Sequence, residues 1–473
     1  MINRHIGYYL GSKLAAAVLS LATMALFVRL GGTETFGAYL VMFAWTYVVY
    51  GLSVQWLRFA FFARYREETS SDLVVTYLKS LAASYAILVA GLAIAASFDL
   101  MPIDFAIGLG VLFIGIVTYD ALYEIARTRL RAGAVAIGVL LRAALMLLFG
   151  VIALTTLKSP LALALAVGLG HLGAAFFLLV AASDKADGTY SKEAMSDLWS
   201  YGRPLIPAYA LDAVGIQLDR LLLAHYRTHV ELGTYGAAAD FIRQVMIVIA
   251  EAIAGAYFAI ARNDIVAGRQ DQASHSLGQA FLAYTALTAF AATFVLRFDR
   301  WIFDTLYGSE IGAAVEPIIG LIVINNAALI FRAYFFGQII FLTPSSSLLF
   351  YSNLASVTIS TLLGFTLVPG YGMYGAAIAM MMGHIAGSAV YIWVWRGHFV
   401  MKLPYMHAAT IVFAALAAYV LSGPLANAYP TSLWAAIVNL GIFGILALLV
   451  ARAFDILSFN SLTAAALARF KST

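Results

Sequence analysis

Nine ionisable side chains lie inside long apolar segments of the sequence, where a charge is costly. They are Arg58, Asp120, Glu124, Arg142, Asp212, Asp240, Arg243, Glu251 and Arg332. One charge at the centre of a membrane-spanning helix costs about 2.5–3.5 kcal/mol, so this set facing lipid would cost roughly 20–30 kcal/mol, more than the net stability of a typical fold. We therefore expect these side chains to face one another or a water-filled cavity.

Two kinds of chemistry suit these residues. An arginine donates two parallel hydrogen bonds to phosphate oxygens, so the arginines favour a phosphate-rich ligand, and the candidate binding residues are Arg58, Arg142, Arg243 and Arg332. Carboxylates in the same cavity would couple an ion such as H⁺ or Na⁺, or orient the arginines, and the candidates are Asp120, Asp212, Asp240 and Glu251. For any single residue, a buried ion pair that fixes two helices is an equally good interpretation.

The spacing of the charges follows the period of a helix. Asp240, Arg243 and Glu251 stand at i, i+3 and i+11, which places them on one helical face. Polar stripes of this kind recur in both halves of the chain, so we expect two bundles that face each other across a hydrated cleft. The adjacent Asp219 and Arg220 lie near the predicted external end of their helix and are a candidate gating or structural pair, with a ligand site as an equally good alternative.

The composition is that of a polytopic membrane protein. Of the 473 residues, 63% are hydrophobic and 11% are charged, with a mean hydropathy of +0.90, whereas soluble chains are about 45–50% apolar and about 25% charged. The absence of cysteine excludes disulfides and thiolate chemistry. No nucleotide-binding loop or nucleophile elbow is visible, and the largest predicted external loop, about 298–313, is too short to fold alone. We expect a transporter, with no catalytic residue, no metal site and no cofactor.

The apolar segments predict an all-α protein with about fourteen transmembrane helices, because a span needs roughly 20 apolar residues. We expect two six-helix lobes related by a repeat, followed by two further helices. The predicted boundaries are an N-terminal lobe at 1–183, a cytoplasmic linker at 184–200, a C-terminal lobe at 201–396, and two additional helices with a cytoplasmic tail at 397–473.

The basic residues outside the spans predict the orientation. With the N-terminus inside, about eighteen of them fall on the cytoplasmic side and about six on the other, which agrees with the positive-inside rule. We therefore expect both termini in the cytoplasm, and the cysteine-free, alanine-rich composition favours a bacterial inner membrane.

Short stretches of the first half of the chain recur in the second half. Gly11 and Arg29 are as far apart as Gly202 and Arg220, and Gly170-His171 recurs as Gly383-His384. Phe36–Tyr39 also matches Leu232–Tyr235. These echoes predict a parallel repeat whose second copy begins near Tyr201. His171 and His384 occupy equivalent positions, where helix packing and proton transfer are the two alternatives.

Several of these segments resemble bacterial polysaccharide flippases of the Wzx type, which belong to the MATE-like multidrug/oligosaccharidyl-lipid/polysaccharide (MOP) superfamily. The resemblance lies in Gly11 with Arg29–Tyr39, in Tyr201–Pro204 with Asp219-Arg220 and Leu232–Ala238, and in Tyr371-Gly372 with Gly375–Ala379. It covers nearly the whole chain.

The resemblance implies a flippase that moves an undecaprenyl-pyrophosphate-linked oligosaccharide to the outer leaflet by alternating access, for O-antigen, capsule or exopolysaccharide synthesis. It also implies contacts with the polysaccharide polymerase and the chain-length machinery. The alternatives are a MATE-type exporter of cationic drugs, a peptidoglycan-precursor lipid flippase, and a membrane glycosyltransferase or polymerase. The excess of intramembrane arginine argues against the drug exporter, and the lack of a large external loop argues against the enzyme.

Overall fold

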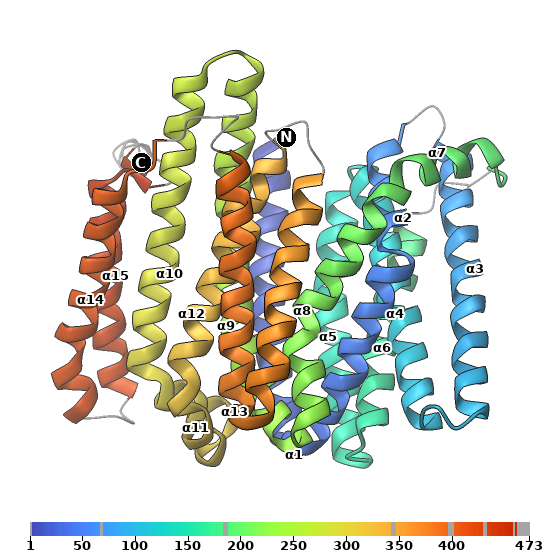
Figure 1. Cartoon of the computed structure of the whole chain (residues 1–473), viewed down its shortest axis with the longest axis horizontal. Helices are drawn as coiled ribbons and strands as arrows, with labels where there is room; N and C mark the ends of the chain where they lie inside the picture. Colours follow the sequence, from blue (N-terminus) through green and yellow to red (C-terminus); the bar gives the residue numbers. More distant parts are fainter. Residues whose placement is uncertain are drawn as a thin grey trace. The chain divides into compact units, whose positions relative to one another are not determined.

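The computed structural model describes residues 2–66, 70–182, 188–341, 347–395, 402–428, 433–456 and 459–460, and the regular structure in these ranges is helical (Figure 1). The longer elements are α1 (Ile2–Ser53), α2 (Gln55–Arg64), α3 (Ser70–Ser97), α4 (Ile103–Thr128), α5 (Ala132–Thr156), α6 (Pro160–Ala182), α7 (Lys192–Gly202), α8 (Ile206–Tyr226), α9 (His229–Val266), α10 (Gln270–Tyr307), α11 (Ser309–Val315), α12 (Ile319–Ile330), α13 (Ser347–Trp395), α14 (Tyr405–Ala428) and α15 (Leu433–Ala453). The predicted all-α polytopic class is confirmed.

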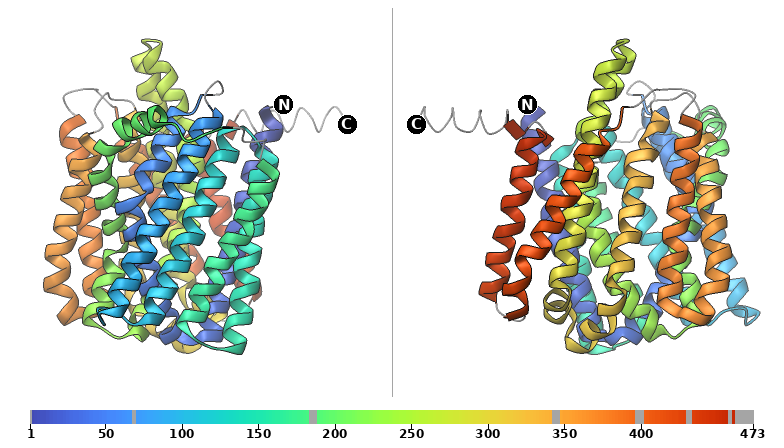
Figure 2. Two further views of the ribbon diagram at one scale, coloured as in Figure 1. Left: turned by 90° about the vertical axis from the view of Figure 1, so that its right-hand side faces the viewer. Right: turned by 60° about the vertical axis from the view of Figure 1, so that its left-hand side comes forward.

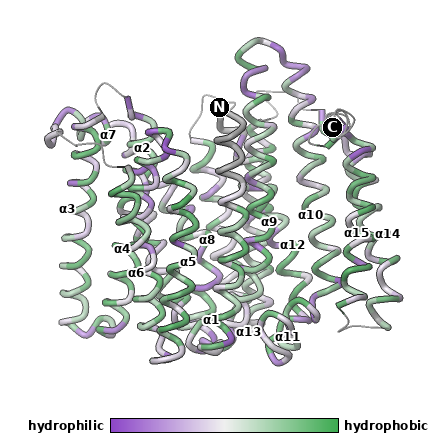
Figure 3. Tube along the Cα trace, turned by 180° about the vertical axis from the view of Figure 1, so that it is seen from behind, coloured by the Kyte–Doolittle hydropathy of each residue, from purple (hydrophilic) through white to green (hydrophobic). Residues whose placement is uncertain are grey.

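Eleven helical segments of the described chain are long and apolar enough to cross a membrane. Three of them, within α1, α10 and α13, contain a backbone break, at Gly32, Phe298 and Gly372. The breaks in α1 and α13 leave a long helix on each side, so the described chain has about eleven to thirteen long apolar helices. The remaining candidate is α8, which has 21 residues but includes Asp212, Asp219 and Arg220. The fourteen-helix arrangement remains a proposal that depends on α8 crossing the membrane. Along the spans the residues are mostly hydrophobic, and hydrophilic residues gather near the helix ends (Figure 3).

The helices group into two compact units. The first comprises Met1–Ala237 with Ser360–Ala376, and the second comprises Ala238–Ile359 with Ala377–Thr473. In the first unit, α6 packs against α4 and α5, and α1 packs against α5 and α8. This unit ends at Ala237, whereas the sequence repeat begins again near Tyr201, so α8 clusters with the N-terminal helices. The two repeat-related lobes remain a proposal.

Two glycines at equivalent positions of the repeat meet inside the first unit. A Cβ atom on Gly37 would lie 1.9 Å from the carbonyl oxygen of His229, and a Cβ atom on Gly233 would lie 1.9 Å from that of Thr33. Each carbonyl belongs to the residue four positions before the opposite glycine. The segments matched by the sequence repeat therefore cross with their backbones in contact, which only glycine permits.

The break at Gly372 is held by side chains from the start of α9 and the end of α8. The Glu231 carboxylate accepts a hydrogen bond from the backbone N–H of Met373 at 2.7 Å, and the Arg227 guanidinium donates to the carbonyl oxygen of Val368 at 3.3 Å. Gly372 adopts a positive φ of 53°, and a Cβ atom there would collide with the Glu231 carboxylate. The chain therefore breaks its helix at Gly372, although Pro369 remains inside the helix.

The region predicted as a polar linker contains a helix, α7, whose axis lies across the ends of α2 and α3 (Figures 1 and 2). The Ser191 hydroxyl caps this helix by accepting from the Ala194 N–H at 3.1 Å. Glu193 accepts from its own N–H and from the Ser191 hydroxyl, which lowers the pKa of this exposed carboxyl. Trp199 packs edge-on against Trp56 with ring centroids 5.2 Å apart. The sequence expectation missed this helix because its one apolar face is too short to resemble a span.

In the second unit, α14 packs against α10 and α15 (Figure 2). Phe298, Ile302, Ala418 and Phe443 form a small buried cluster among these helices. The predicted external loop at about 298–313 is instead helical, because α10 continues to Tyr307 and α11 begins at Ser309. Asp299 and Asp304 are therefore on α10, not in a loop.

Candidate functional site

The charges of the first unit form a network in which Arg58 joins two carboxylates of α4. The Arg58 guanidinium lies 2.8 Å from Asp120 and 3.3 Å from Glu124. The Tyr50 hydroxyl also donates to Asp120 at 3.1 Å. Arg127 pairs with Glu124 at 2.6 Å on the same helix. Two arginines and two carboxylates thus balance, and Glu124, which is only 1% exposed, connects them.

The chain positions this network through a break and a helical repeat. Helix α1 ends at Ser53, Val54 leaves the helical conformation, and α2 restarts at Gln55, which turns Arg58 toward α4. Asp120 and Glu124 are four residues apart and therefore share a face of α4. The side chains of Arg58 and Asp120 remain 27% and 21% exposed. The ion pairs anticipated as the alternative to ligand binding are thus present here.

Arg142 has a different environment, although it lies in the same unit. Its guanidinium carbon lies 4.8 Å from the centroid of the Tyr119 ring, a cation–π contact. His171 packs edge-on against the same ring, with centroids 5.7 Å apart. In the described part of the chain, no ion pair is formed by Arg142, and its buried Nε has no hydrogen-bond partner. The guanidinium is therefore held against the Tyr119 ring, which does not neutralise its charge.

In the second unit, Arg332 donates hydrogen bonds to two uncharged side chains. Arg332 is 6% exposed and donates from Nε to Nδ1 of His384 at 3.1 Å and from Nη1 to the amide oxygen of Asn353 at 2.8 Å. It belongs to a π-helical segment, Phe331–Phe335, a distortion that is frequent at functional sites. A Cβ atom on Gly387 would lie 2.8 Å from the Arg332 side chain, so the glycine leaves room for it.

The two repeat-equivalent histidines differ in their hydrogen bonds. Nδ1 of His171 lies 2.9 Å from the Val167 carbonyl, which can only accept, so this nitrogen carries a proton. Nδ1 of His384 accepts from Arg332, so this nitrogen is unprotonated and the imidazole is neutral. Both are buried. Each unit therefore pairs a buried histidine with a nearby arginine, through a tyrosine ring in one and directly in the other.

The remaining candidates on α9 are only partly brought together. Arg243 pairs with Asp240 one turn away, and both are half-buried. Glu251 lies further along the same helix and is exposed. The predicted shared helix is confirmed, and the pairing of Arg243 with Asp240 is local to one turn.

The proposed gating residues are buried at the end of α8. Asp219 accepts from the backbone N–H of Arg220 at 2.8 Å and from the Tyr235 hydroxyl at 3.1 Å. The Arg220 guanidinium lies 5.8 Å from the Phe43 ring centroid. Asp212 is half-buried on the same helix. The gating role itself remains a proposal.

Four residues of these clusters were not selected from the sequence as site residues. Asn353 and Tyr50 are uncharged, so no charge pattern selects them. Glu124 is charged, but the sequence does not distinguish it as a site residue from the other charged residues of its helix. His384 was visible through the repeat, but its arginine partner lies 52 residues away in the chain. Within the part of the chain that the structure describes, no three histidines or carboxylates gather as metal ligands.

No protein-family model and no curated protein matches the sequence. Solved structures do match the fold. The lipid II flippase MurJ in an inward closed conformation matches with a TM-score of 0.75 over 95% of this chain and 98% of that chain, at 11% identity. An inward-facing multidrug resistance MATE transporter matches with a TM-score of 0.63 over 85% of this chain and 98% of that chain, at 14% identity.

A third match is a MOP superfamily transporter from Pyrococcus furiosus, described as having a binding pocket of reversed polarity. Its TM-score is 0.53 over 85% of this chain and 96% of that chain, at 13% identity. At these identities the likeness shows the fold alone. The matched proteins are described as a lipid II flippase and as transporters of the MOP superfamily.

Proposed function

We propose that the protein is a flippase for an undecaprenyl-pyrophosphate-linked oligosaccharide, which it moves from the cytoplasmic to the outer leaflet of a bacterial inner membrane by alternating access. The observation that carries this proposal is the cationic site at Arg142. Its guanidinium stacks against the Tyr119 ring and forms no ion pair among the described residues, so the ring orients the guanidinium without cancelling its charge. A pyrophosphate is the lipid-linked group that such forks recognise.

The same observation argues against a cationic drug as the substrate. A cationic drug would be repelled by the half-buried Arg142 guanidinium, which no described carboxylate neutralises. The extent of the structural matches supports the same choice, because the lipid flippase matches 95% of the chain and the MATE transporters about 85%. The difference is comparable in length to α14 and α15 together.

A first test measures transport of a fluorescent undecaprenyl-pyrophosphate oligosaccharide in sealed proteoliposomes. We expect Arg142→Gln to slow translocation by about tenfold or more, since a charge-assisted hydrogen bond to phosphate is worth about 1.5–3 kcal/mol. Arg300→Gln is the matched control, because Arg300 is exposed and pairs with Glu316 at 3.6 Å. Full transport by a well-folded Arg142→Gln protein would exclude this arginine from pyrophosphate binding.

A second test is made in cells that lack the gene. A complete lipid-linked repeat unit trapped on the cytoplasmic leaflet, with surface polysaccharide lost, is the expected result. Normal polysaccharide with no trapped intermediate contradicts the proposal and returns the drug exporter as the leading alternative.

A peptidoglycan-precursor flippase is a second candidate, favoured by the match to the lipid II flippase. That substrate also carries a pyrophosphate, so the arginine sites do not separate the two. Rescue of a strain depleted of its own lipid II flippase would support this candidate, and failure to rescue, together with the trapped repeat unit, would support the first. The predicted coupling to H⁺ or Na⁺, through Asp212, Asp240 or Glu251, is tested in the same vesicles by imposing each gradient separately.

A further inference from the structure

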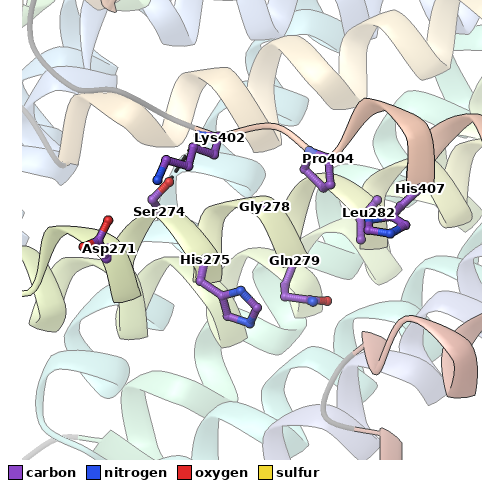
Figure 4. Close-up of a pocket in the computed structure, with 9 residues that line it drawn as sticks. All are labelled: Asp271, Ser274, His275, Gly278, Gln279, Leu282, Lys402, Pro404 and His407. Carbon is purple, nitrogen blue, oxygen red and sulfur yellow. Dashed lines mark hydrogen bonds between the residues drawn. The ribbon is translucent and has the colours of Figure 1, made fainter.

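A polar pocket of about 380 Å³ lies in the second unit, between the beginning of α10 and the segment that leads into α14 (Figure 4). Residues from successive turns of α10 form one wall, and Lys402, Pro404 and His407 form the other. The two walls are held together locally, because the Lys402 backbone N–H donates to the Ser274 hydroxyl at 3.2 Å. Gly278 lies beneath this crossing, where a Cβ atom would stand 3.4 Å from the Lys402 carbonyl oxygen.

The lining of the pocket contains one charge of each sign. Asp271 on α10 supplies a carboxylate and Lys402 supplies an ammonium group, while His275, His407 and Ser274 add neutral hydrogen-bonding groups. The side-chain oxygen of Gln279 is buried and has no hydrogen-bond partner among the described residues. A purely anionic or cationic ligand would meet a like charge in this pocket, whereas a zwitterion with adjacent phosphate and ammonium groups would find a partner for each.

The pocket lies at the level where lipid headgroups stand. The apolar span of α14 begins at Tyr405, directly after Pro404, and the side chains of Tyr405 and Met406 are 67% and 81% exposed. An exposed tyrosine at the end of a span is typical of the membrane–water interface. The volume has room for roughly a dozen water-sized groups, which is the size of a glycerophosphoethanolamine headgroup.

We propose that this pocket binds the headgroup of a phosphoethanolamine lipid, from the leaflet that the charge bias predicts to be cytoplasmic. Lys402 would contact the phosphate and Asp271 would accept a hydrogen bond from the ammonium group, at the same end of the pocket (Figure 4). His275, Gln279 and His407, further along the pocket, would face the glycerol portion of the headgroup. The bound lipid would add to the contacts that hold the start of α14 against α10, which include the hydrogen bond through Ser274 and the Phe281–Tyr405 ring contact.

The test is lipid binding to the purified full-length protein, delipidated in detergent and followed by its thermal unfolding at increasing lipid concentration. We expect phosphatidylethanolamine to bind at least about tenfold more tightly than phosphatidylcholine, whose trimethylammonium group has no N–H to donate. Lys402→Gln and Asp271→Asn should each weaken binding by about tenfold, and Lys402→Arg should retain it. Arg300→Gln should bind as the unchanged protein does and serves as the control.

Three results would overturn the proposal. Equal binding of phosphatidylethanolamine and phosphatidylcholine would remove the role of the ammonium group. Tighter binding of phosphatidylglycerol, strengthened further by Asp271→Asn, would show an anionic-lipid site. Displacement of the lipid by free phosphoethanolamine or inorganic phosphate at the same concentration would show a site for a soluble ligand. Because the readout is binding and not transport, the proposed flippase function is tested independently.

Discussion

Two regions of the first unit hold their arginines in different ways. Arg58 and Arg127 share the carboxylates of Asp120 and Glu124 in a balanced network. Arg142 instead stacks against the Tyr119 ring and forms no ion pair among the described residues. A balanced network fixes helices, whereas a guanidinium that is not neutralised retains its attraction for an anion. We therefore expect the first region to serve mainly structure and the second mainly the substrate.

The largest effect should come from breaking the network at its centre. Glu124→Ala removes two charge-assisted hydrogen bonds, one from Arg58 and one from Arg127, which should lower the free energy of unfolding by about 3 kcal/mol. Thermal unfolding in detergent measures the change. The control is Arg64→Gln, whose ion pair with Asp197 at 3.3 Å is half-exposed and should contribute at most about 1 kcal/mol. Similar losses of unfolding free energy for the two variants would show that the Glu124 network is no more stabilising than the half-exposed Arg64–Asp197 pair.

Arg332→Gln should lower transport strongly and stability only moderately. The change leaves the acceptors of His384 and Asn353 with a weaker donor, so we expect a stability loss of about 1–3 kcal/mol. Transport should fall by tenfold or more, because the substrate pyrophosphate loses a guanidinium that donates two hydrogen bonds. Arg332→Lys keeps the charge and should retain part of the activity. Unchanged transport in a folded Arg332→Gln protein would assign this arginine to structure.

Gly37→Ala tests whether the repeat contact is as tight as the geometry indicates. The new methyl group would collide with the His229 carbonyl, so we expect a loss of about 1–3 kcal/mol. Gly233→Ala is its counterpart and should cost a similar amount. Gly11→Ala is the control, since nothing lies within 4 Å of its Cβ position. A large difference between Gly37→Ala and Gly233→Ala would show that the two halves do not share this contact equally.

The smallest stability effect should follow replacement of a whole ion pair. Arg58→Met combined with Asp120→Leu removes both charges, leaving Glu124 paired with Arg127, and should change the free energy of unfolding by about 1 kcal/mol or less. Transport measured in the same vesicles then decides whether Arg58 also binds substrate. Loss of transport at unchanged stability would return Arg58 to the substrate-binding set.

The sequence by itself determined the class of protein, because apolar length and charge content leave no soluble alternative. It also predicted a repeat, and in the structure the matched glycines Gly37 and Gly233 lie in reciprocal contact. It predicted that Arg58, Asp120 and Glu124 must face one another or water, because a charge facing lipid is costly, and these three side chains form ion pairs.

Only the tertiary structure decided which charges pair and which stand beside neutral groups. Arg58 and Asp120 are 62 residues apart, and Arg332 and His384 are 52 apart, so helical spacing within one segment carries no information about either contact. The partners of Arg332 include an uncharged asparagine, which no charge pattern singles out. The helix α7 and the pocket beside Lys402 likewise depend on how distant segments cross. Local period and hydropathy fix which residues must be buried, and packing fixes what they meet there.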